Sequence, residues 1–237
     1  MMNETESVKK ELKKLADPAR AKAQQRFFKT GPGEYGEGDR FMGVRVPPIR
    51  RLVRKFRGIS MESVDELLAS PWHEERLFAL IMMTDIFKRG SDGDRSAVYG
   101  HYMGSTEYIN SWDLVDVSAP HVPGAFLWKR DRGPLFDLAE SHDLWERRIA
   151  IVATQHFIRN NDFSDTLKIS EMLLKDQHDL IHKAVGWMLR EVGKRDMETE
   201  ESFLRKHCSE MPRTMLRYAI ERFPEDLRQS YLRGEVR

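Results

Sequence analysis

The chain has 237 residues, 40% of them hydrophobic and 32% charged, and a formal net charge of +1, as is typical of a soluble globular protein. No stretch approaches the roughly 18 uncharged apolar residues of a membrane span, and the N-terminus lacks the basic and then apolar pattern of a secretory signal. The single cysteine, Cys208, excludes an internal disulfide, so we expect a reducing, cytoplasmic compartment.

The basic residues gather toward the N-terminus. Residues 1–57 contain 15 Lys and Arg against 7 Asp and Glu, whereas residues 58–237 contain 24 against 31. An asymmetry of this size suggests one basic face that meets a polyanion. A solvated, lysine-rich pair of helices would give the same count, so the charge alone leaves both interpretations open.

The first 57 residues predict three helices around a loop. Apolar residues at helical spacing predict a helix over residues 5–15. Asp17 and Pro18 then predict an N-cap and first turn, and this second, basic helix should run to about Lys29. Four glycines and a proline make residues 30–39 a loop. The third helix should begin at the two prolines 47 and 48 and carry the densest basic cluster of the chain, Arg50, Arg51, Arg54, Lys55 and Arg57.

Beyond residue 58 the pattern becomes repetitive. Similar amphipathic segments begin at Trp72, Leu144, Ile181 and Met215. The spacing of their basic residues along the chain fits a repeat of about 36 residues. Helix pairs repeated at such a period are typical of an α-solenoid, which presents a concave surface. We therefore expect one all-α domain over residues 1–237, a superhelix of antiparallel helix pairs with a concave basic groove. Residues 1–57 would form its basic helical cap, and residues 58–237 the repeats.

The stretch Ser111–Asp116 is the strongest candidate for chemistry. On a helix, Trp112 and Asp116 project from one face, one turn apart, and an indole beside a carboxylate can hold a cationic group. The alternative is a plain helix start, with Trp112 in the core and Asp113 near the positive helix end. Later repeats should add cations and a second indole to the same concave surface, namely Arg148, Lys183, Trp187 and Arg190.

Other motifs are weak. His178 and His182 are an isolated i, i+4 pair, which is more often surface than a metal site. The glycine-rich loop at residues 30–39 lacks the Gly-Lys-Ser/Thr of a phosphate-binding loop, and no GxSxG nucleophile motif occurs. We expect neither a metal nor a cofactor.

Three segments together resemble the AlkD-type DNA alkylation repair glycosylases, a family of HEAT-like repeat proteins. They are residues 112–116 (WDLVD), residues 145–150 (WERRIA) and residues 183–191 (KAVGWMLRE). The resemblance implies HEAT-like helix pairs and hydrolysis of the N-glycosidic bond of cationic N3- or N7-alkylated purines in duplex DNA. It further implies that the base is not flipped into a pocket and that no cofactor is needed.

The same resemblance assigns roles to residues. Asp116 corresponds to the catalytic carboxylate, which would stabilise the oxocarbenium-like transition state and position water. Trp112 and Trp187 correspond to its two indoles, and Arg148 and Arg190 to arginines that contact the DNA backbone. Further DNA contacts are expected from Lys183, Arg45, Phe27, Arg26, Arg50, Arg51 and Arg54.

Two positions depart from the family pattern. Phe27 stands where well-studied members have a tyrosine, and Arg45 where they have a glutamine. Phe27 lacks a hydroxyl that could bond a phosphate, whereas Arg45 adds a charge. A non-catalytic paralogue that binds DNA, including branched DNA, therefore stays open as a second hypothesis, and a helical scaffold for another protein as a third. We expect a monomer that is nucleoid-associated when on DNA.

Overall fold

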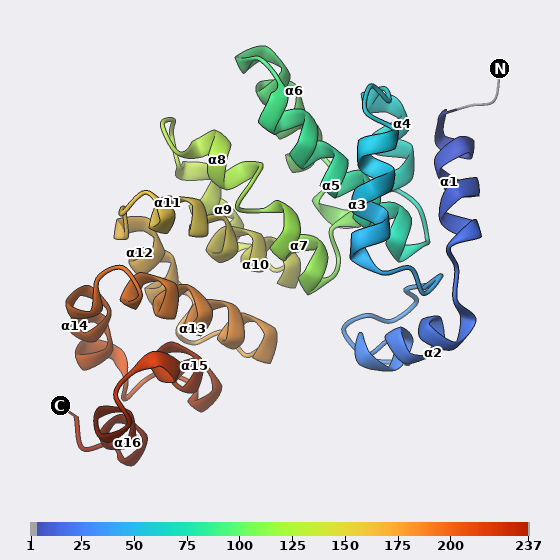
Figure 1. Ribbon diagram of the computed structural model, residues 1–237. Helices are drawn as coiled ribbons and strands as arrows, with labels where there is room; N and C mark the ends of the chain where they lie inside the picture. The colour runs from blue at the N-terminus through green and yellow to red at the C-terminus, as the bar shows by residue number, and fades with distance from the viewer. Residues whose placement is uncertain (1–3, 237) are drawn as a thin grey trace. The chain divides into compact units, whose positions relative to one another are not determined.

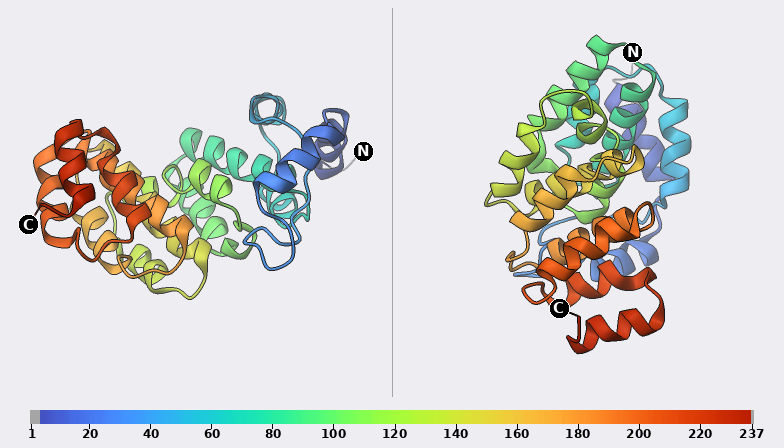
Figure 2. Two further views of the ribbon diagram at one scale, coloured as in Figure 1. Left: turned by 90° about the horizontal axis from the view of Figure 1, so that it is seen from below. Right: turned by 90° about the vertical axis from the view of Figure 1, so that its left-hand side faces the viewer.

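The computed structural model describes residues 4–236, and these form helices joined by turns, with no strand among them beyond one isolated bridge between Arg40 and Trp72. The chain divides into two compact units, Met1–Ser118 and Ala119–Arg237. Figure 1 gives the order of the helices, and Figure 2 shows the same elements from two further sides.

The first unit is built around helix α5, His73–Arg89, whose first eleven residues are all buried. A helix that is buried on every side needs neighbours on every side, and α5 packs against α3, α4, α6 and α7. The unit comprises α1 (Glu4–Lys14), α2 (Pro18–Phe27), α3 (Val46–Lys55), α4 (Met61–Leu68), α5, α6 (Asp92–Met103), η1 (Thr106–Tyr108) and α7 (Trp112–Ser118).

The second unit is built around helix α13, Asp179–Gly193, which packs against α10, α12, α14 and α15. Its buried residues recur every three or four positions, as expected for an amphipathic helix. The other elements are α8 (Pro123–Leu127), α9 (Gly133–Glu140), α10 (Leu144–Ala153), α11 (Gln155–Arg159), α12 (Ser164–Met172), α14 (Met197–His207), α15 (Arg213–Ala219), η2 (Ile220–Arg222) and α16 (Glu225–Arg233).

Local signals in the sequence place the helix starts. The Asp17 side chain accepts a hydrogen bond from the Arg20 N–H, as expected of an N-cap ahead of a proline. Ser60 caps α4 through the Ser63 N–H in the same way. The second helix ends two residues before the predicted Lys29, because Lys29 has a left-handed backbone with φ of 52°.

The predicted fold class is confirmed: the described chain is all-helical and built from packed helix pairs. Each helix expected from the sequence is present, although α2 ends before Lys29 and α3 ends at Lys55, so that Arg57 lies beyond it. No helix in residues 4–236 is long and apolar enough to cross a membrane. The single domain with a cap at residues 1–57 and the concave basic groove stay predictions.

Candidate functional site

Trp112 and Asp116 share one face of α7. Leu114, Val115 and Ser118 are buried against the unit, whereas Trp112 and Asp116 are only partly buried. This alternation follows the helical period, so the indole and the carboxylate lie one turn apart on the face that solvent reaches. The arrangement predicted from the sequence is thus present on α7.

A buried phenol lies behind this face. Tyr102 is fully buried, with its hydroxyl 3.0 Å from Ser118 Oγ, and Ser118 Oγ in turn donates to the Leu114 carbonyl at 2.6 Å. Burial raises the pKa of Tyr102, and the negative charge of Asp116 raises it further. Tyr102 therefore stays neutral and fixes the helix that carries Asp116.

Trp112 packs at the end of a column of stacked aromatic rings. Phe28 stacks on Trp112, with ring centroids 5.3 Å apart and planes at 14°, and on Phe41 at 4.9 Å and 23°. Phe41 stacks in turn on the His73 ring at 4.4 Å. Phe27 meets Trp112 edge-on at 6.0 Å. Phe28 and Phe41 are buried, so they hold the indole in a fixed plane.

His73 ends the column in a buried ionic network. Its Nδ1 lies 2.7 Å from Asp39 Oδ2, and its Nε2 lies 2.9 Å from Asp113 Oδ2. Arg76 also binds Asp39, at 2.7 Å. Burial acts to lower the pKa of His73, but Asp113 and Asp39 overcome it and raise the pKa to about 9. Both ring nitrogens therefore carry protons and donate to the carboxylates.

This network ties three segments together. Asp39 closes the glycine-rich loop, His73 opens α5, and Asp113 lies in the first turn of α7 beside Trp112. Burial acts to raise the pKa of Asp39, but His73 and Arg76 hold it below its usual range. Two contacts hold Asp113 at the start of α7. His73 binds its carboxylate, and the Ser111 hydroxyl donates to it at 2.8 Å.

A second buried carboxylate positions Arg45. Glu74 accepts the backbone N–H groups of Met42, Gly43 and Val44 at 2.8 to 3.0 Å. The backbone of this segment is thereby fixed just before Arg45, which is exposed at the start of α3. Beside it, a hollow of about 520 Å³ is lined by residues of α2, α3, α5 and α7, including Gln24, Phe28, Arg45, His73 and Trp112.

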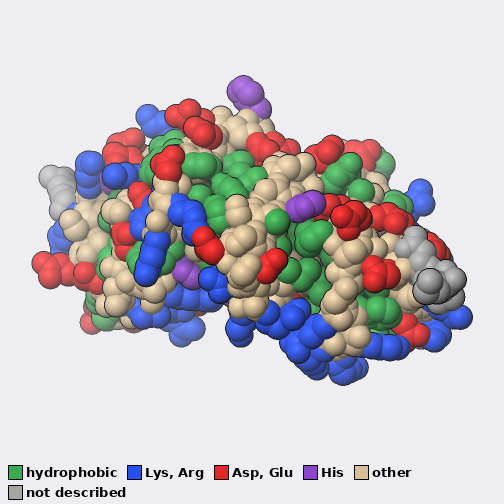
Figure 3. Space-filling view, turned by 90° about the horizontal axis from the view of Figure 1, so that it is seen from above, with side chains coloured by type: hydrophobic (Ala, Val, Ile, Leu, Met, Phe, Trp, Pro, Cys, Tyr) green, Lys and Arg blue, Asp and Glu red, His purple; other side chains and the backbone are tan. Residues whose placement is uncertain are grey.

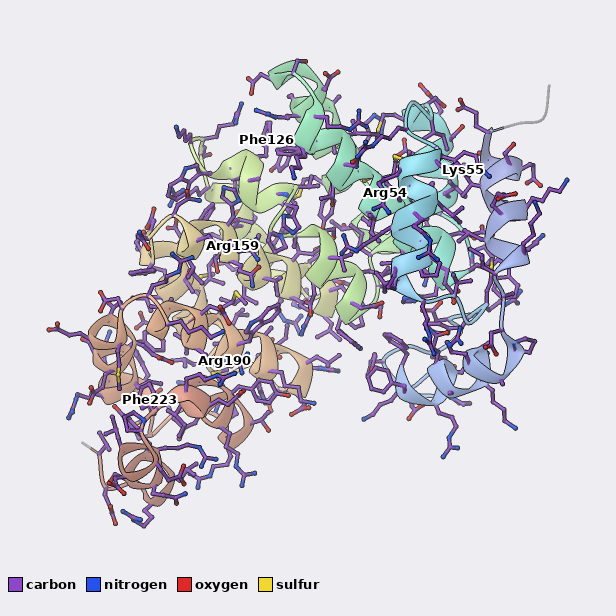
Figure 4. All side chains as sticks on the ribbon, viewed as in Figure 1. Arg54, Lys55, Phe126, Arg159, Arg190 and Phe223 are labelled. Atoms are coloured by element: carbon purple, nitrogen blue, oxygen red, sulfur yellow. The ribbon has the colours of Figure 1, made fainter. Side chains whose placement is uncertain are left out.

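The arginines expected to contact DNA from the first unit are all exposed. Arg26 lies on α2, and Arg50, Arg51 and Arg54 lie on α3. Arg54 and Lys55 extend from α3 in Figure 4. In the space-filling view of Figure 3, Lys and Arg side chains gather along the lower right edge, on the side of α3. The first unit therefore has a basic face.

In the second unit, the predicted residues of α13 share a partly exposed face. Lys183, Trp187 and Arg190 are half-buried, whereas their neighbours at positions 184–186, 188 and 189 are buried. Trp187 Nε1 donates to Glu191 at 3.1 Å. Lys183 lies 2.7 Å from Asp179. The indole is thus oriented by a polar contact on its own helix.

The two predicted arginines of this unit already have protein partners. Arg190, labelled in Figure 4, pairs with Glu221. Arg148 is only 4% exposed, and its Nη1 donates to the Leu180 carbonyl at 2.7 Å. Glu200 lies near Arg190. Burial raises the pKa of the Glu200 carboxyl to about 8, although the positive charge of Arg190 acts to lower it.

Gly186, within the KAVGWMLRE segment, has a packing role. A Cβ added there would lie 2.5 Å from Tyr218 Cβ and would also clash with the Met215 carbonyl, so α13 and α15 approach closely because this residue has no side chain.

We expect Gly186→Ala to lower the free energy of unfolding by about 1–3 kcal/mol, the cost of overpacking. Chemical denaturation measures it. Gly100→Ala, where an added Cβ meets nothing within 4 Å, is the matched control, and equal stability of the two variants would contradict the packing argument.

The sequence did not reveal Asp39, His73 or Glu74 as parts of the site. Their partners are 30 to 40 residues away along the chain, and no local pattern predicts such pairs. No group of three His, Cys, Asp or Glu side chains within residues 4–236 could hold a metal ion.

Comparisons with known proteins agree with this picture. The family model described as "DNA alkylation repair enzyme" matches residues 8–223. Among solved structures, a predicted DNA alkylation repair enzyme from Enterococcus faecalis is similar in fold, with a TM-score of 0.67 at 15% identity, over 89% of this chain and 97% of that one. No curated protein matches. Since the family model spans most of the helices in both units, the chain belongs to the DNA alkylation repair enzyme family.

Proposed function

We propose that this protein is a DNA glycosylase that hydrolyses the N-glycosidic bond of cationic N3- and N7-alkylated purines in duplex DNA without flipping the base. The observation that carries the proposal is the shared, partly exposed face of Trp112 and Asp116 on α7. Family membership supports a role in DNA repair, and this pair supplies a chemistry suited to a cationic lesion.

The proposed reaction needs one carboxylate. When the bond between deoxyribose C1′ and the purine nitrogen breaks, its electron pair leaves with the base and neutralises the base's positive charge. Positive charge then develops on the sugar, as in glycoside hydrolysis generally. Asp116 stabilises this charge and orients a water, whose oxygen bonds to C1′ and whose proton passes to Asp116 or to solvent. No general acid is required, because the leaving purine is already cationic.

The other residues hold the DNA. Trp112 offers a π face to the cationic nucleotide, an interaction of about 0.5–2 kcal/mol, and Trp187 is its proposed counterpart in the second unit. Arg26, Arg45 and the arginines of α3 neutralise phosphates. Arg148, Lys183 and Arg190 are proposed to contact the backbone as well, with Arg190 exchanging Glu221 for a phosphate. The protein would act as a monomer in the cytoplasm, at the nucleoid.

The direct test is base release from methylated duplex DNA. We expect the protein to release 7-methylguanine or 3-methyladenine, detected by chromatography, without added metal or cofactor and with chelator present. Unmethylated DNA is the control, because a neutral purine is a poor leaving group. Salt-sensitive binding without release from any alkylated duplex would overturn the glycosylase proposal and favour a non-catalytic paralogue that binds duplex or branched DNA. Absence of DNA binding at low salt would remove both.

A further inference from the structure

No residue of helix α2 is fully buried. None of the ten residues Pro18–Phe27, all described by the structure, is buried. The helix contains Arg20, Lys22 and Arg26 and no acidic residue. A helix without an apolar packed face gains little stability from the core, so other contacts must hold it in place.

The start of α2 is fixed to the loop that Glu74 holds. The Asp17 N–H donates to the Met42 carbonyl at 2.9 Å, and Arg20 Nη1 donates to the Gly43 carbonyl at 2.8 Å. Gly43 has φ of 85°, and a Cβ there would clash with the Asp17 carbonyl. Only glycine allows this close approach. The start of α2 is therefore held tightly against residues 42 and 43.

The end of α2 is fixed by the aromatic column and by a strained turn. Phe28 is buried between Trp112 and Phe41. Lys29 then adopts the left-handed conformation, which is unfavourable for a residue with a side chain. The Gly36 N–H donates to the Lys29 carbonyl at 3.0 Å and holds that turn. Strain of this kind persists where the surrounding structure enforces it, often at functional sites.

The turn directs Phe28 inward and leaves Phe27 outside. Phe27 is 65% exposed, more than any other large hydrophobic side chain in residues 4–236. Its ring rests edge-on against Trp112 and Phe28, at 6.0 and 5.2 Å between centroids. The ring is thus backed by a rigid aromatic support. The same segment carries three exposed cations, Lys22 and Arg26 on α2 and Lys29 in the turn.

We infer that Phe27 is a wedge that inserts from the minor groove between stacked bases of duplex DNA while the cations of α2 hold the phosphates. The inference rests on the proposed function, which makes DNA the partner. Proteins that enter the minor groove use apolar side chains in this way to unstack a base step and bend the duplex. An exposed aromatic ring on a helix rich in cations matches DNA, in which stacked bases lie beside phosphates, better than it matches an apolar protein surface. In this role the aromatic ring of Phe27 is the group that acts, and the hydroxyl of a tyrosine at this position is not needed.

The experiment uses duplexes with 2-aminopurine placed step by step around a non-hydrolysable abasic-site analogue, together with end-labelled duplexes that report bending by energy transfer. We expect the wild-type protein to raise 2-aminopurine fluorescence severalfold at one step and to bend the duplex. Phe27→Ala should lose both signals and keep the salt dependence of binding, whereas Phe27→Tyr should keep both signals. The fold should survive these changes because the ring is largely exposed, and the thermal midpoint checks this.

Arg26→Ala is the matched control on the same helix. It should keep the fluorescence rise and reduce the slope of log K against log salt by about 1, as expected for one lost phosphate contact. If the wild-type protein binds DNA and releases alkylated bases without unstacking any step, the wedge is wrong and the glycosylase proposal stands. The same conclusion follows if Phe27→Ala unstacks the step as well as wild type does. If the protein does not bind DNA, both proposals fail.

Discussion

Replacing Asp116 by asparagine should reduce the rate of base release from alkylated duplex DNA by about 100-fold or more, with little loss of DNA affinity. Asparagine has nearly the same shape as aspartate but no charge, so it cannot stabilise positive charge on the deoxyribose. Losses of 10²–10³ are typical when one preorganised electrostatic group is removed from an active site. Affinity should hold or rise, because the substitution removes a negative charge beside a polyanion. Single-turnover release at saturating enzyme and a separate binding titration measure the two quantities.

A matched control separates chemistry from general electrostatics. Glu107 is an exposed carboxylate in η1 of the same unit, and Glu107→Gln removes the same charge without touching α7. We expect it to release base at the wild-type rate. The Asp116→Asn protein should keep a thermal midpoint near that of wild type. Release by Asp116→Asn at more than a tenth of the wild-type rate would exclude Asp116 as the stabilising carboxylate.

Local patterns in the sequence were enough to predict α7 and the face that Trp112 and Asp116 share. A tryptophan and an aspartate four residues apart lie on one face of a helix, and the apolar Leu114 and Val115 between them point to the buried side. The cap at Asp17 was equally predictable from the sequence, because capping depends on residues within one turn. The segment KAVGWMLRE was predicted as part of a site, and the structure adds that Gly186 serves the contact between α13 and α15.

Long-range pairs were not predictable in this way. His73 meets Asp39 and Asp113 across 34 and 40 residues, and a single sequence has no signal for such contacts. The contact between the Arg148 guanidinium and the carbonyl of Leu180, 32 residues later, is of the same kind. The repeat period predicted that Arg148 lies on a helix but could not show which groups of the next helix lie within its reach.

The buried network around His73 predicts how stability depends on pH. Folding raises the pKa of His73 from 6.5 to about 9, so the folded protein binds this proton more tightly than the unfolded chain. The resulting stabilisation is fully present below pH 6.5 and is lost as the pH rises through about 9. A difference of this size corresponds to about 3 kcal/mol. The groups that face the ring are Asp39 from the loop, Asp113 from α7 and, through Asp39, Arg76 from α5.

Denaturant unfolding at intervals between pH 6 and pH 10 should therefore show a loss of stability for the wild-type protein that His73→Phe lacks. His73→Phe should itself be less stable at pH 7 by about 3–5 kcal/mol, because it removes the buried cation that Asp39 and Asp113 share. His101→Gln is the control: His101 also binds an aspartate, Asp65 at 2.7 Å, but at the surface, where such pairs contribute about 0–1 kcal/mol.

Asp113→Asn distinguishes the network from a general alkaline effect. Removing one of the two carboxylates lowers the pKa of His73 toward its ordinary value, so the loss of stability should begin at lower pH than in the wild-type protein. Tyrosine and lysine side chains elsewhere titrate equally in both proteins and cancel in the difference. If the wild-type, His73→Phe and Asp113→Asn proteins show parallel pH profiles, His73 is not a buried cation, and no ion pair with His73 holds the start of α7 beside Trp112.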